Sequence, residues 1–524
     1  MHKEQQAANM TTNTTKMLSE KIIKPDGGRL GESLPRSQAT LPAIARLCEN
    51  LQAERIDYCH WKSNAALDRS ASGDNDLDFL INRADASRFT ELVCQLGFKE
   101  AYGPREEQLP GVRDFYGYDE ISARLIHVHA HFQLVLGHDL TKNYHLPIER
   151  PYLDSAIQGG LFRIPAPEFE FVVFVIRMML KHSTWDAVLI GHGSLSTSER
   201  LELDFLLTQV SSEKANAILE QCLPYMNRDL FESCIQALRP DCPLWKRIRA
   251  GQQLQSRLDS CARRPQMVDA CLKVWRRFER PIHYRLHLKE FKKRWAKGGM
   301  LVAVVGGDGS GKTTVVANLY QKFSDEFDVI KVHMGKPSWS LTTIITRGIL
   351  KIGRSLGFYP FIKEGVEPSL DTNSPSFPGY PWLIREVCTA RDRYLDYKRA
   401  RRFASNGGLV ICDRFPLPQI KIMDGPQVER VTCGMKTNAL IKFLAALERR
   451  YYQQIMPPDL LIVLRVAPEV CVQRKTDETA DSVRSRVEEI WNLDWRETSA
   501  HIVDASKPKS QVLSDVLNLV WSYV

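Results

Sequence analysis

The sequence lacks several patterns that would place the protein in a specialised class. Twelve cysteines are scattered with no Cys-x-x-Cys pair, which predicts reduced core thiols and no zinc site. No run of about 18 apolar residues occurs, so no transmembrane helix is expected. The first 24 residues are polar and show no apolar core of a signal peptide. Together these absences predict a cytoplasmic protein.

Composition sets further bounds. A chain of 524 residues, 44% hydrophobic and 25% charged, has the make-up of a globular protein with roughly two to four domains. The net charge of +9 favours anionic ligands but is too small for this length to predict a nucleic-acid partner. No internal repeat is found. We expect four parts: a disordered leader over 1–38, an α+β domain over 39–150, a helical domain over 151–297, and an α/β domain over 298–524.

Within the first domain, the pattern predicts helices over 41–53 and 84–96 and strands over 57–62 and 77–81. Alternating apolar positions over 114–118 and 123–134 predict a hairpin. The next domain is predicted to be helical, with breaks near 191–193, 239–240 and Pro281. The segment 273–297 is strongly basic, which predicts either a solvated amphipathic helix or a basic contact surface.

The strongest single motif is a glycine-rich segment of the form Gly-x4-Gly-Lys-Ser/Thr. An apolar strand over 301–305 precedes it and a helix over 315–323 follows it. In this context the backbone N–H groups are expected to wrap a triphosphate at a helix N-terminus, with a chance glycine turn as the alternative. The predicted ATP-binding residues are Gly306, Gly307, Asp308, Gly309, Ser310, Gly311, Lys312, Thr313 and Thr314. Lys312 would reach the β/γ-phosphates and the Thr313 hydroxyl would hold Mg²⁺.

Further apolar runs predict a doubly wound parallel sheet, with strands over 301–305, 328–333, 408–413, 460–466 and 501–504. Asp413 and Arg414 end the third of these strands. Because the carboxyl ends of parallel strands meet beside the phosphate loop, Asp413 is placed to bind Mg²⁺ and Arg414 to grip a phosphate. The alternative is an ordinary surface strand end.

Two more cationic clusters flank this centre. Arg391, Asp392 and Arg393 precede the third strand and could hold an acceptor phosphate, or form a surface ion-pair set. Three arginines follow the fourth strand, around a polar, acidic stretch over 476–482; they are Arg474, Arg484 and Arg486. That composition is typical of a mobile lid that closes basic side chains onto a transferring phosphate, or of a solvated charged helix.

The last 225 or so residues resemble thymidylate kinase. The shared features are the phosphate loop, Asp392-Arg393, Asp413-Arg414-Phe415, the start of a strand at Pro457-Pro458-Asp459-Leu460, and Asp504-Ala505-Ser506. The resemblance implies that Asp308 contacts the acceptor sugar, that Arg393 contacts the acceptor nucleotide, and that Asp413 and Arg414 lie at the Mg²⁺ and phosphate centre. We further predict that Arg391 and Phe415 contact the acceptor and that Arg474 contacts ATP. One subtype of that family carries an arginine where this chain has Gly309. The other subtype supplies a catalytic arginine from the lid, which implies Arg484 or Arg486.

The chain also departs from that family. Thymidylate kinases follow the Asp-Arg-aromatic triplet with a serine and an Ala-Tyr-Gln stretch, whereas this chain continues Pro416-Leu417-Pro418-Gln419. An insertion over 339–380 falls where the acceptor would bind. Its first part, 341–356, is apolar and basic at helical spacing, which predicts a lid or pocket helix, with membrane-surface contact as the alternative. The comparison therefore supports phosphoryl transfer better than thymidine specificity.

A second candidate site lies near the N-terminus. His60-Trp61-Lys62-Ser63-Asn64 is followed by Asp76-Leu77-Asp78, whose two carboxylates share one strand face and could share Mg²⁺. This arrangement resembles the nucleotidyltransferase superfamily of DNA polymerase beta over roughly 40–290. His127 stands where that family places a third carboxylate, so the domain is either active or a degenerate binding domain. His127, His129 and His131 share a face and predict either structural histidines or a transition-metal site.

The sequence thus predicts a kinase that uses ATP and Mg²⁺ to phosphorylate a nucleoside monophosphate, most simply dTMP. Two other functions stay open. The protein could be a kinase or nucleotidyltransferase acting on a sugar or another metabolite of surface-polysaccharide assembly. It could also be a nucleotide-driven switch that contacts a partner through 273–297. Many kinases of the resembled type dimerise, so a homodimer is a further expectation.

Overall fold

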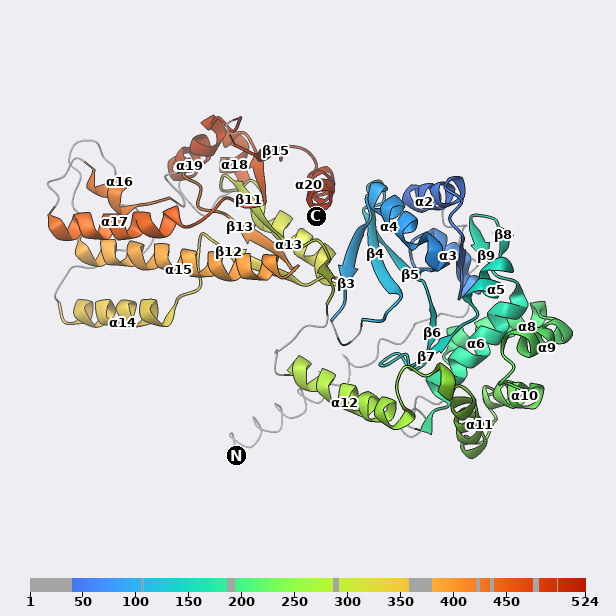
Figure 1. Ribbon diagram of the computed structural model, residues 1–524. Coiled ribbons are helices and arrows are strands. Elements are labelled where there is room, and N and C mark those ends of the chain that lie inside the picture. Colours follow the sequence, from blue (N-terminus) through green and yellow to red (C-terminus); the bar gives the residue numbers. More distant parts are fainter. Residues whose placement is uncertain are drawn as a thin grey trace, which may run out of the picture.

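The computed structural model describes residues 40–104, 106, 108–185, 194–285, 292–357, 379–420, 425–433, 438–474, 480–496 and 498–524. The predicted leader, the core of the predicted lid (475–479) and most of the insertion after 357 therefore lie outside the described residues. Two sheets with their helices make up the two halves of the molecule (Figure 1).

The N-terminal half is built on a six-stranded sheet in the order β1-β2-β5-β4-β3-β10. Its strands are β1 Tyr58–His60, β2 Leu77–Ile81, β3 Lys99–Tyr102, β4 Val112–Asp119, β5 Arg124–His131 and β10 Arg294–Trp295. β2 and β5 run parallel, whereas β4 and β5 form the expected antiparallel hairpin. Helices α2 Pro42–Ala53 and α4 Ala86–Gln95 pack their apolar faces against this sheet.

Shorter elements connect this sheet to a helical part. They are α3 Leu67–Ala71, β6 Leu134–Leu136, β7 Tyr144–Leu146, α5 Glu149–Asp154, β8 Ile157–Gly159 and β9 Phe162–Ile164. The helices are α6 Pro167–His182, α8 Thr197–Gln209, α9 Ser212–Cys222, α10 Arg228–Ala237, α11 Leu244–Arg257 and α12 Gln266–Arg285. The predicted break at Pro281 is wrong, because α12 runs through it. Pro281 lies near the C-terminal end of α12, and the helix continues beyond it to Arg285.

The C-terminal half contains a five-stranded parallel sheet in the order β12-β13-β11-β14-β15. Its strands are β11 Met300–Gly306, β12 Val329–His333, β13 Leu409–Asp413, β14 Leu460–Arg465 and β15 Ala500–Asp504. The central strands are buried on both faces, which explains their unbroken apolar sequence.

Helices cover both faces of this sheet. α13 Lys312–Ser324 and α20 Lys509–Tyr523 contribute to one core, and α15 Tyr380–Ser405 to the other. The remaining helices are α14 Leu341–Ser355, α16 Val428–Thr432, α17 Ala439–Gln453, α18 Pro468–Arg474 and α19 Ala480–Asn492. This is the P-loop NTPase fold, as the sequence predicts, and it brings the carboxyl ends of β11 and β13 side by side.

The two halves share one core. β10 belongs to the segment that leads into the C-terminal half, yet it pairs with β3 of the N-terminal sheet. The Trp295 ring stacks on Phe327 with centroids 3.9 Å apart, and the same cluster includes Tyr116, Tyr118 and Trp521. The sheets are therefore joined by packing as well as by the chain.

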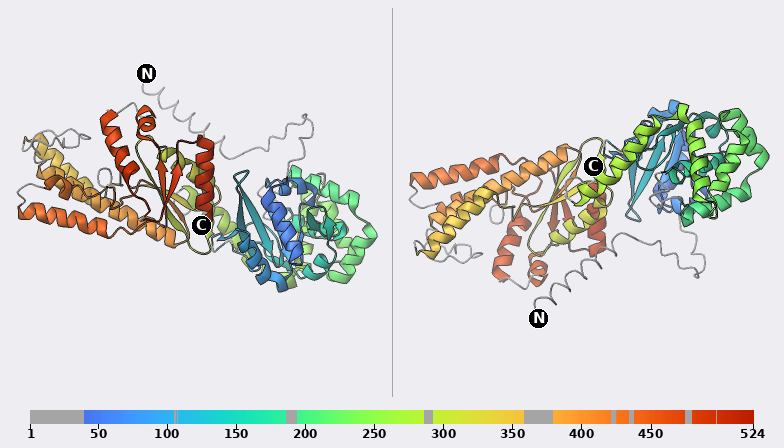
Figure 2. Two further views of the ribbon diagram at one scale, coloured as in Figure 1. Left: turned by 90° about the horizontal axis from the view of Figure 1, so that it is seen from above. Right: turned by 90° about the horizontal axis from the view of Figure 1, so that it is seen from below.

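Helices α14, α15 and α17 extend away from the C-terminal sheet as a projecting layer (Figure 2). Along α14 an apolar stripe is exposed; its members are Leu341, Ile345, Ile349, Ile352 and, just beyond the helix, Leu356. In the described part of the chain, every helix is too short or too polar to cross a membrane.

Candidate functional site

The phosphate loop bridges β11 and α13. Gly306 ends the strand, and Lys312 is the first residue of the helix. Gly309 adopts a left-handed φ of +85°, and a Cβ there would lie 2.9 Å from the carbonyl oxygen of Cys471. Only glycine therefore fits that position without displacing α18.

Two side chains at the start of α13 are held by oxygen atoms of the protein beside the loop. The Lys312 ammonium donates to the carbonyl oxygens of Gly306 at 3.0 Å and Gly307 at 2.8 Å. The Thr313 hydroxyl donates to Asp413 Oδ2 at 3.2 Å. A hydroxyl and a carboxylate are the hard oxygen ligands that Mg²⁺ prefers, so this pair fits the predicted ion. Ser310 is buried within the loop and Thr314 is exposed.

Asp308 gathers cations from three separate elements. Its side chain is only 4% exposed, and its Oδ1 accepts from Arg414 at 2.8 Å. Arg486 of α19 lies 3.1 Å from Oδ2, and the Lys312 ammonium lies 3.8 Å from Oδ1. The chain turns sharply after β13, because Arg414 has a φ of +66° and its N–H donates to the Val304 carbonyl. Three of the predicted catalytic side chains thus converge over the phosphate loop.

The other two predicted arginines of this region lie elsewhere. Arg484 is exposed on α19. Arg474 ends α18, with a guanidinium nitrogen 3.5 Å from the Ala505 carbonyl oxygen. That contact places it beside the turn after β15, where the predicted Asp504-Ala505-Ser506 motif lies.

The predicted acceptor residues on α15 and after β13 do not share one open surface. Arg393 is 6% exposed and donates through Nε to the Met334 carbonyl at 2.8 Å and through another nitrogen to the Tyr452 hydroxyl. Arg391 donates to Thr342 of α14. The ring of Phe415 is 1% exposed within a core cluster. Of the predicted acceptor set, the structure brings Asp308 alone into the cation cluster at the phosphate loop.

The parallel sheet, its strand order and the glycine-rich loop together define the C-terminal half as a P-loop nucleotide-binding domain. No model of a known protein family matches the chain. The chain is 30% identical over 227 residues to the uncharacterized ATP-binding protein YghR of Escherichia coli strain K12, covering 42% of this chain and 86% of YghR. It therefore belongs to the same family as YghR.

Two further comparisons are weaker. The uncharacterized ATP-binding protein YghS of E. coli strain K12 is 24% identical over 42% of this chain and 92% of its own length. A solved thymidylate kinase from Candida albicans is 19% identical over 43% of this chain and 91% of its own, with a TM-score of 0.27. That structural likeness is too weak to bear on the substrate.

The N-terminal carboxylates lie beside the three predicted histidines. His127 is held between Asp76 at 2.9 Å and Asp114 at 2.7 Å, and Lys293 reaches Asp114 at 3.2 Å. Burial lowers the pKa of His127, but the hydrogen bonds to Asp114 and Asp76 outweigh it and leave that pKa raised. Asp114 was missed in the sequence. Its position on β4 opposite His129 could have indicated it once the hairpin register was known.

The second carboxylate has different neighbours. Asp78 Oδ1 lies 2.8 Å from the Lys62 ammonium and 3.2 Å from His129 Nδ1, and His131 Nε2 lies 3.3 Å from the same His129 nitrogen. Burial lowers the pKa of both His129 and His131. These shifts favour the neutral form of His129 and His131, whereas the shift of His127 favours its protonated form.

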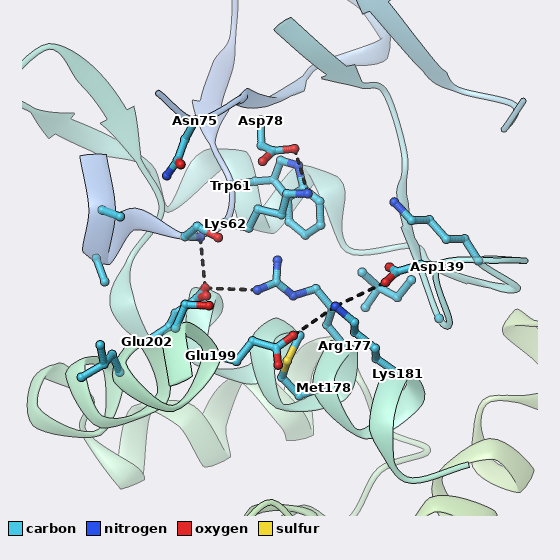
Figure 3. A pocket seen from close by; sticks show the side chains of 18 of the residues that line it. Trp61, Lys62, Asn75, Asp78, Asp139, Arg177, Met178, Lys181, Glu199 and Glu202 are labelled. Atoms are coloured by element: carbon cyan, nitrogen blue, oxygen red, sulfur yellow. Dashed lines mark hydrogen bonds and ion pairs between the residues drawn. The ribbon is translucent and has the colours of Figure 1, made fainter. Parts of the chain in front are cut away.

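Beside Asp78 opens a cavity of about 490 Å³ (Figure 3). Its cations come from separate elements; they are Lys62, Arg69, Lys142, Arg177 and Lys181. Arg177 pairs with Glu202 at 3.1 Å, and Lys181 pairs with Glu199 at 3.1 Å. Burial and then the nearby Lys62 charge lower the pKa of Lys142 to about 8. The lining also holds four carboxylates, Asp78, Asp139, Glu199 and Glu202, so five cationic and four anionic side chains meet at this cavity.

Proposed function

We propose that the C-terminal half transfers the γ-phosphoryl group of ATP to a small phosphorylated acceptor, most simply a nucleoside monophosphate such as dTMP. The observation that carries this proposal is the convergence of Lys312, Arg414 and Arg486 over the phosphate loop. The names of YghR and YghS as ATP-binding proteins favour ATP as the donor.

Phosphoryl transfer needs positioning and charge stabilisation more than covalent chemistry. The loop N–H groups would bind the β-phosphate, and Lys312 would exchange its two carbonyl contacts for phosphate oxygens. Arg414 and Arg486, which pair with Asp308 in this structure, would move to contact the oxygens of the transferring phosphoryl group. Mg²⁺ held at Thr313 and Asp413 would supply charge neutralisation of the β- and γ-oxygens.

The nature of the acceptor is the open part of this proposal. Arg393 and Phe415 are engaged inside the protein, so neither supports thymidine recognition by an exposed pocket. A sugar or other metabolite of surface-polysaccharide assembly is therefore the alternative acceptor. A nucleotide-driven switch is the alternative without turnover. The cation cluster favours transfer, because a switch needs ATP binding but no charge stabilisation at a transferring group.

The test is a turnover assay with Mg·ATP and a panel of nucleoside monophosphates, followed by ADP release. Lys312→Ala is the blank, and Lys322→Ala, at the other end of α13, is the matched control. Turnover on dTMP that requires Lys312 but not Lys322 supports the proposal. ATP binding without turnover on any nucleotide overturns nucleotide phosphorylation, and a screen of phosphorylated sugars then separates the other kinase from the switch.

For the N-terminal half, we propose that the cavity beside Asp78 binds an anionic, phosphorylated ligand. The supporting observation is the set of lysines and arginines that line one cavity. Lys62 comes from the loop after β1, Lys142 from a turn, and Arg177 and Lys181 from α6. The resemblance to nucleotidyltransferases makes a nucleoside triphosphate the first ligand to test. Calorimetry should show binding that weakens about tenfold or more in Arg177→Ala and stays unchanged in Arg150→Ala, which alters an exposed ion pair on α5. Equal affinity in both variants would contradict it.

A further inference from the structure

We propose that Asp78, His129 and His131 form a binding site for a divalent transition-metal ion such as Zn²⁺, Fe²⁺ or Mn²⁺. The site would lie in the N-terminal sheet and is independent of the phosphate loop and of the kinase proposed there. Each of the three residues offers one ligand atom, and these atoms lie within 4.8 Å of one another.

The spacing of the donor atoms is close to that of a coordination sphere. His129 Nδ1 lies 3.2 Å from Asp78 Oδ1 and 3.3 Å from His131 Nε2, and the third edge, from His131 Nε2 to Asp78 Oδ1, is 4.0 Å. Ligands bound at about 2.0–2.2 Å from a metal stand about 3.0–3.5 Å apart. Two edges already match, and the third needs a shift of only about half an ångström.

The fold fixes this geometry through register. β2 and β5 are parallel neighbours, and Asp78 is paired directly with His129. Since side chains alternate along a strand, His131 lies on the same face as His129. His131 is fully buried, and its ring packs edge-on against Trp61 with centroids 5.0 Å apart, which restrains its orientation.

The third histidine of that strand face belongs to a different cluster. His127 is engaged through both ring nitrogens, since Nδ1 lies 2.9 Å from Asp76 Oδ1 and Nε2 lies 2.7 Å from Asp114 Oδ1. Its two nitrogens are therefore directed at carboxylates other than Asp78. The predicted row of histidines is therefore divided between two clusters. His127 pairs with Asp76 and Asp114, whereas His129 and His131 lie beside Asp78.

Two imidazoles and one carboxylate are a ligand set of borderline softness, which suits Zn²⁺ or Fe²⁺ better than Mg²⁺ or Ca²⁺. Three protein ligands leave further coordination positions for water or another ligand. Those positions are reachable, because Asp78 lines the cavity of about 490 Å³ and His129 lines a neighbouring one of about 250 Å³.

Lys62 is the competitor for this site. Its ammonium lies 2.8 Å from Asp78 Oδ1, the oxygen that the metal would use. The Lys62 side chain is 20% exposed at the cavity and also lies over the Trp61 ring, so it has room to move aside. Metal and ammonium would exclude each other from the carboxylate, and removal of the ammonium should therefore strengthen metal binding.

The experiment uses the full chain, stripped with a chelator and titrated with Co²⁺, whose visible absorption reports nitrogen and oxygen coordination. We expect one Co²⁺ per chain, at least tenfold weaker binding in His129→Asn and Asp78→Asn, and about tenfold tighter binding in Lys62→Met. His145→Ala, which alters a histidine bonded to Glu149 on other elements, should bind as the parent does.

Three outcomes would overturn the proposal. They are no visible Co²⁺ spectrum, a spectrum dominated by thiolate charge transfer from the cysteines, and an affinity that is the same in Asp78→Asn and the parent. His131 is buried, so its variants could fail to fold; His129→Asn and the gain expected in Lys62→Met carry the test, with circular dichroism as the check on folding. Because the readout is metal binding, a failed kinase assay leaves this test unaffected.

Discussion

The Tyr116 hydroxyl donates to Glu326 Oε2 at 2.9 Å, and this hydrogen bond joins the two halves of the protein. The Tyr116 hydroxyl oxygen also accepts from the Lys293 ammonium at 2.6 Å, and Lys293 in turn pairs with Asp114 at 3.2 Å. Glu326 follows α13, the helix that begins with Lys312. A continuous polar chain therefore runs from the N-terminal carboxylate cluster to the far end of the phosphate-loop helix.

Tyr116→Phe should weaken the junction between the halves. The hydroxyl belongs to a ring that is 1% exposed, and its removal deletes two hydrogen bonds without opening a large cavity. We expect a loss of about 1 kcal/mol in the free energy of unfolding, measured by urea titration. Tyr320→Phe on α13, which leaves the Glu326 contact in place, is the control. Equal midpoints for the two variants would show that the hydroxyl contributes nothing to the junction.

Arg486→Ala and Arg484→Ala should separate a catalytic arginine from a surface one. Both lie on α19, but Arg486 lies 3.1 Å from Asp308 while Arg484 is exposed. If the domain transfers a phosphoryl group, loss of Arg486 should lower kcat by about 10²–10³-fold, with ATP affinity nearly unchanged. Arg484→Ala should retain the parent rate. The reverse ranking would place the lid arginine at 484.

Asp413→Asn should raise the Mg²⁺ concentration that ATP binding requires. The carboxylate accepts from Thr313 and supplies the negative charge beside the loop. We expect the Mg²⁺ concentration needed for half-maximal ATP affinity to rise about tenfold, since an amide is a poorer ligand for a hard cation. Asp504→Asn, at the carboxyl end of β15 in the same sheet, serves as the control. An unchanged Mg²⁺ requirement in Asp413→Asn would move the ion away from this carboxylate.

The C-terminal sheet was predictable because its strands are buried on both faces and the phosphate loop has a fixed glycine spacing. The strands over 301–305 and 408–413 appear as β11 and β13, with ends that differ from the predicted ones by no more than one residue. Contacts between distant elements were not predictable. Nothing in the sequence distinguishes Arg486 from Arg484. Only the packing of α19 decides that the Arg486 side chain reaches Asp308.

The N-terminal half shows the same limit. Alternation predicts the hairpin and places Asp76 and Asp78 on one strand face, but the pairing of His127 with Asp114 depends on the register between β4 and β5. That register is set by tertiary packing and not by local pattern. Apart from Lys62, the cavity cations are absent from the prediction, because Lys142 and Lys181 come to the cavity beside Asp78 only in the folded chain.

Glu170→Gln should change how stability depends on pH. Glu170 is 5% exposed on α6 and accepts from the backbone N–H of Asn64 at 3.2 Å and its side-chain amide at 2.8 Å. Burial raises the pKa of Glu170 from 4.5 to about 7, against the opposing effect of those hydrogen bonds. The folded protein therefore holds this proton more tightly than the unfolded chain does. The stability that follows is present at low pH and is lost as the pH rises from about 4.5 towards 7.

The variant lacks this titration, so its stability relative to the parent should improve by up to about 3 kcal/mol between pH 5 and pH 8. Urea midpoints measured across that range give the difference directly, and taking a difference cancels the contributions of the other titrating groups. Glu232→Gln, which alters an exposed pair with Arg228, should show a nearly constant difference from the parent. A constant difference for Glu170→Gln as well would mean that Glu170 is ionised in the folded protein throughout, with Asn64 and Arg177 compensating its burial.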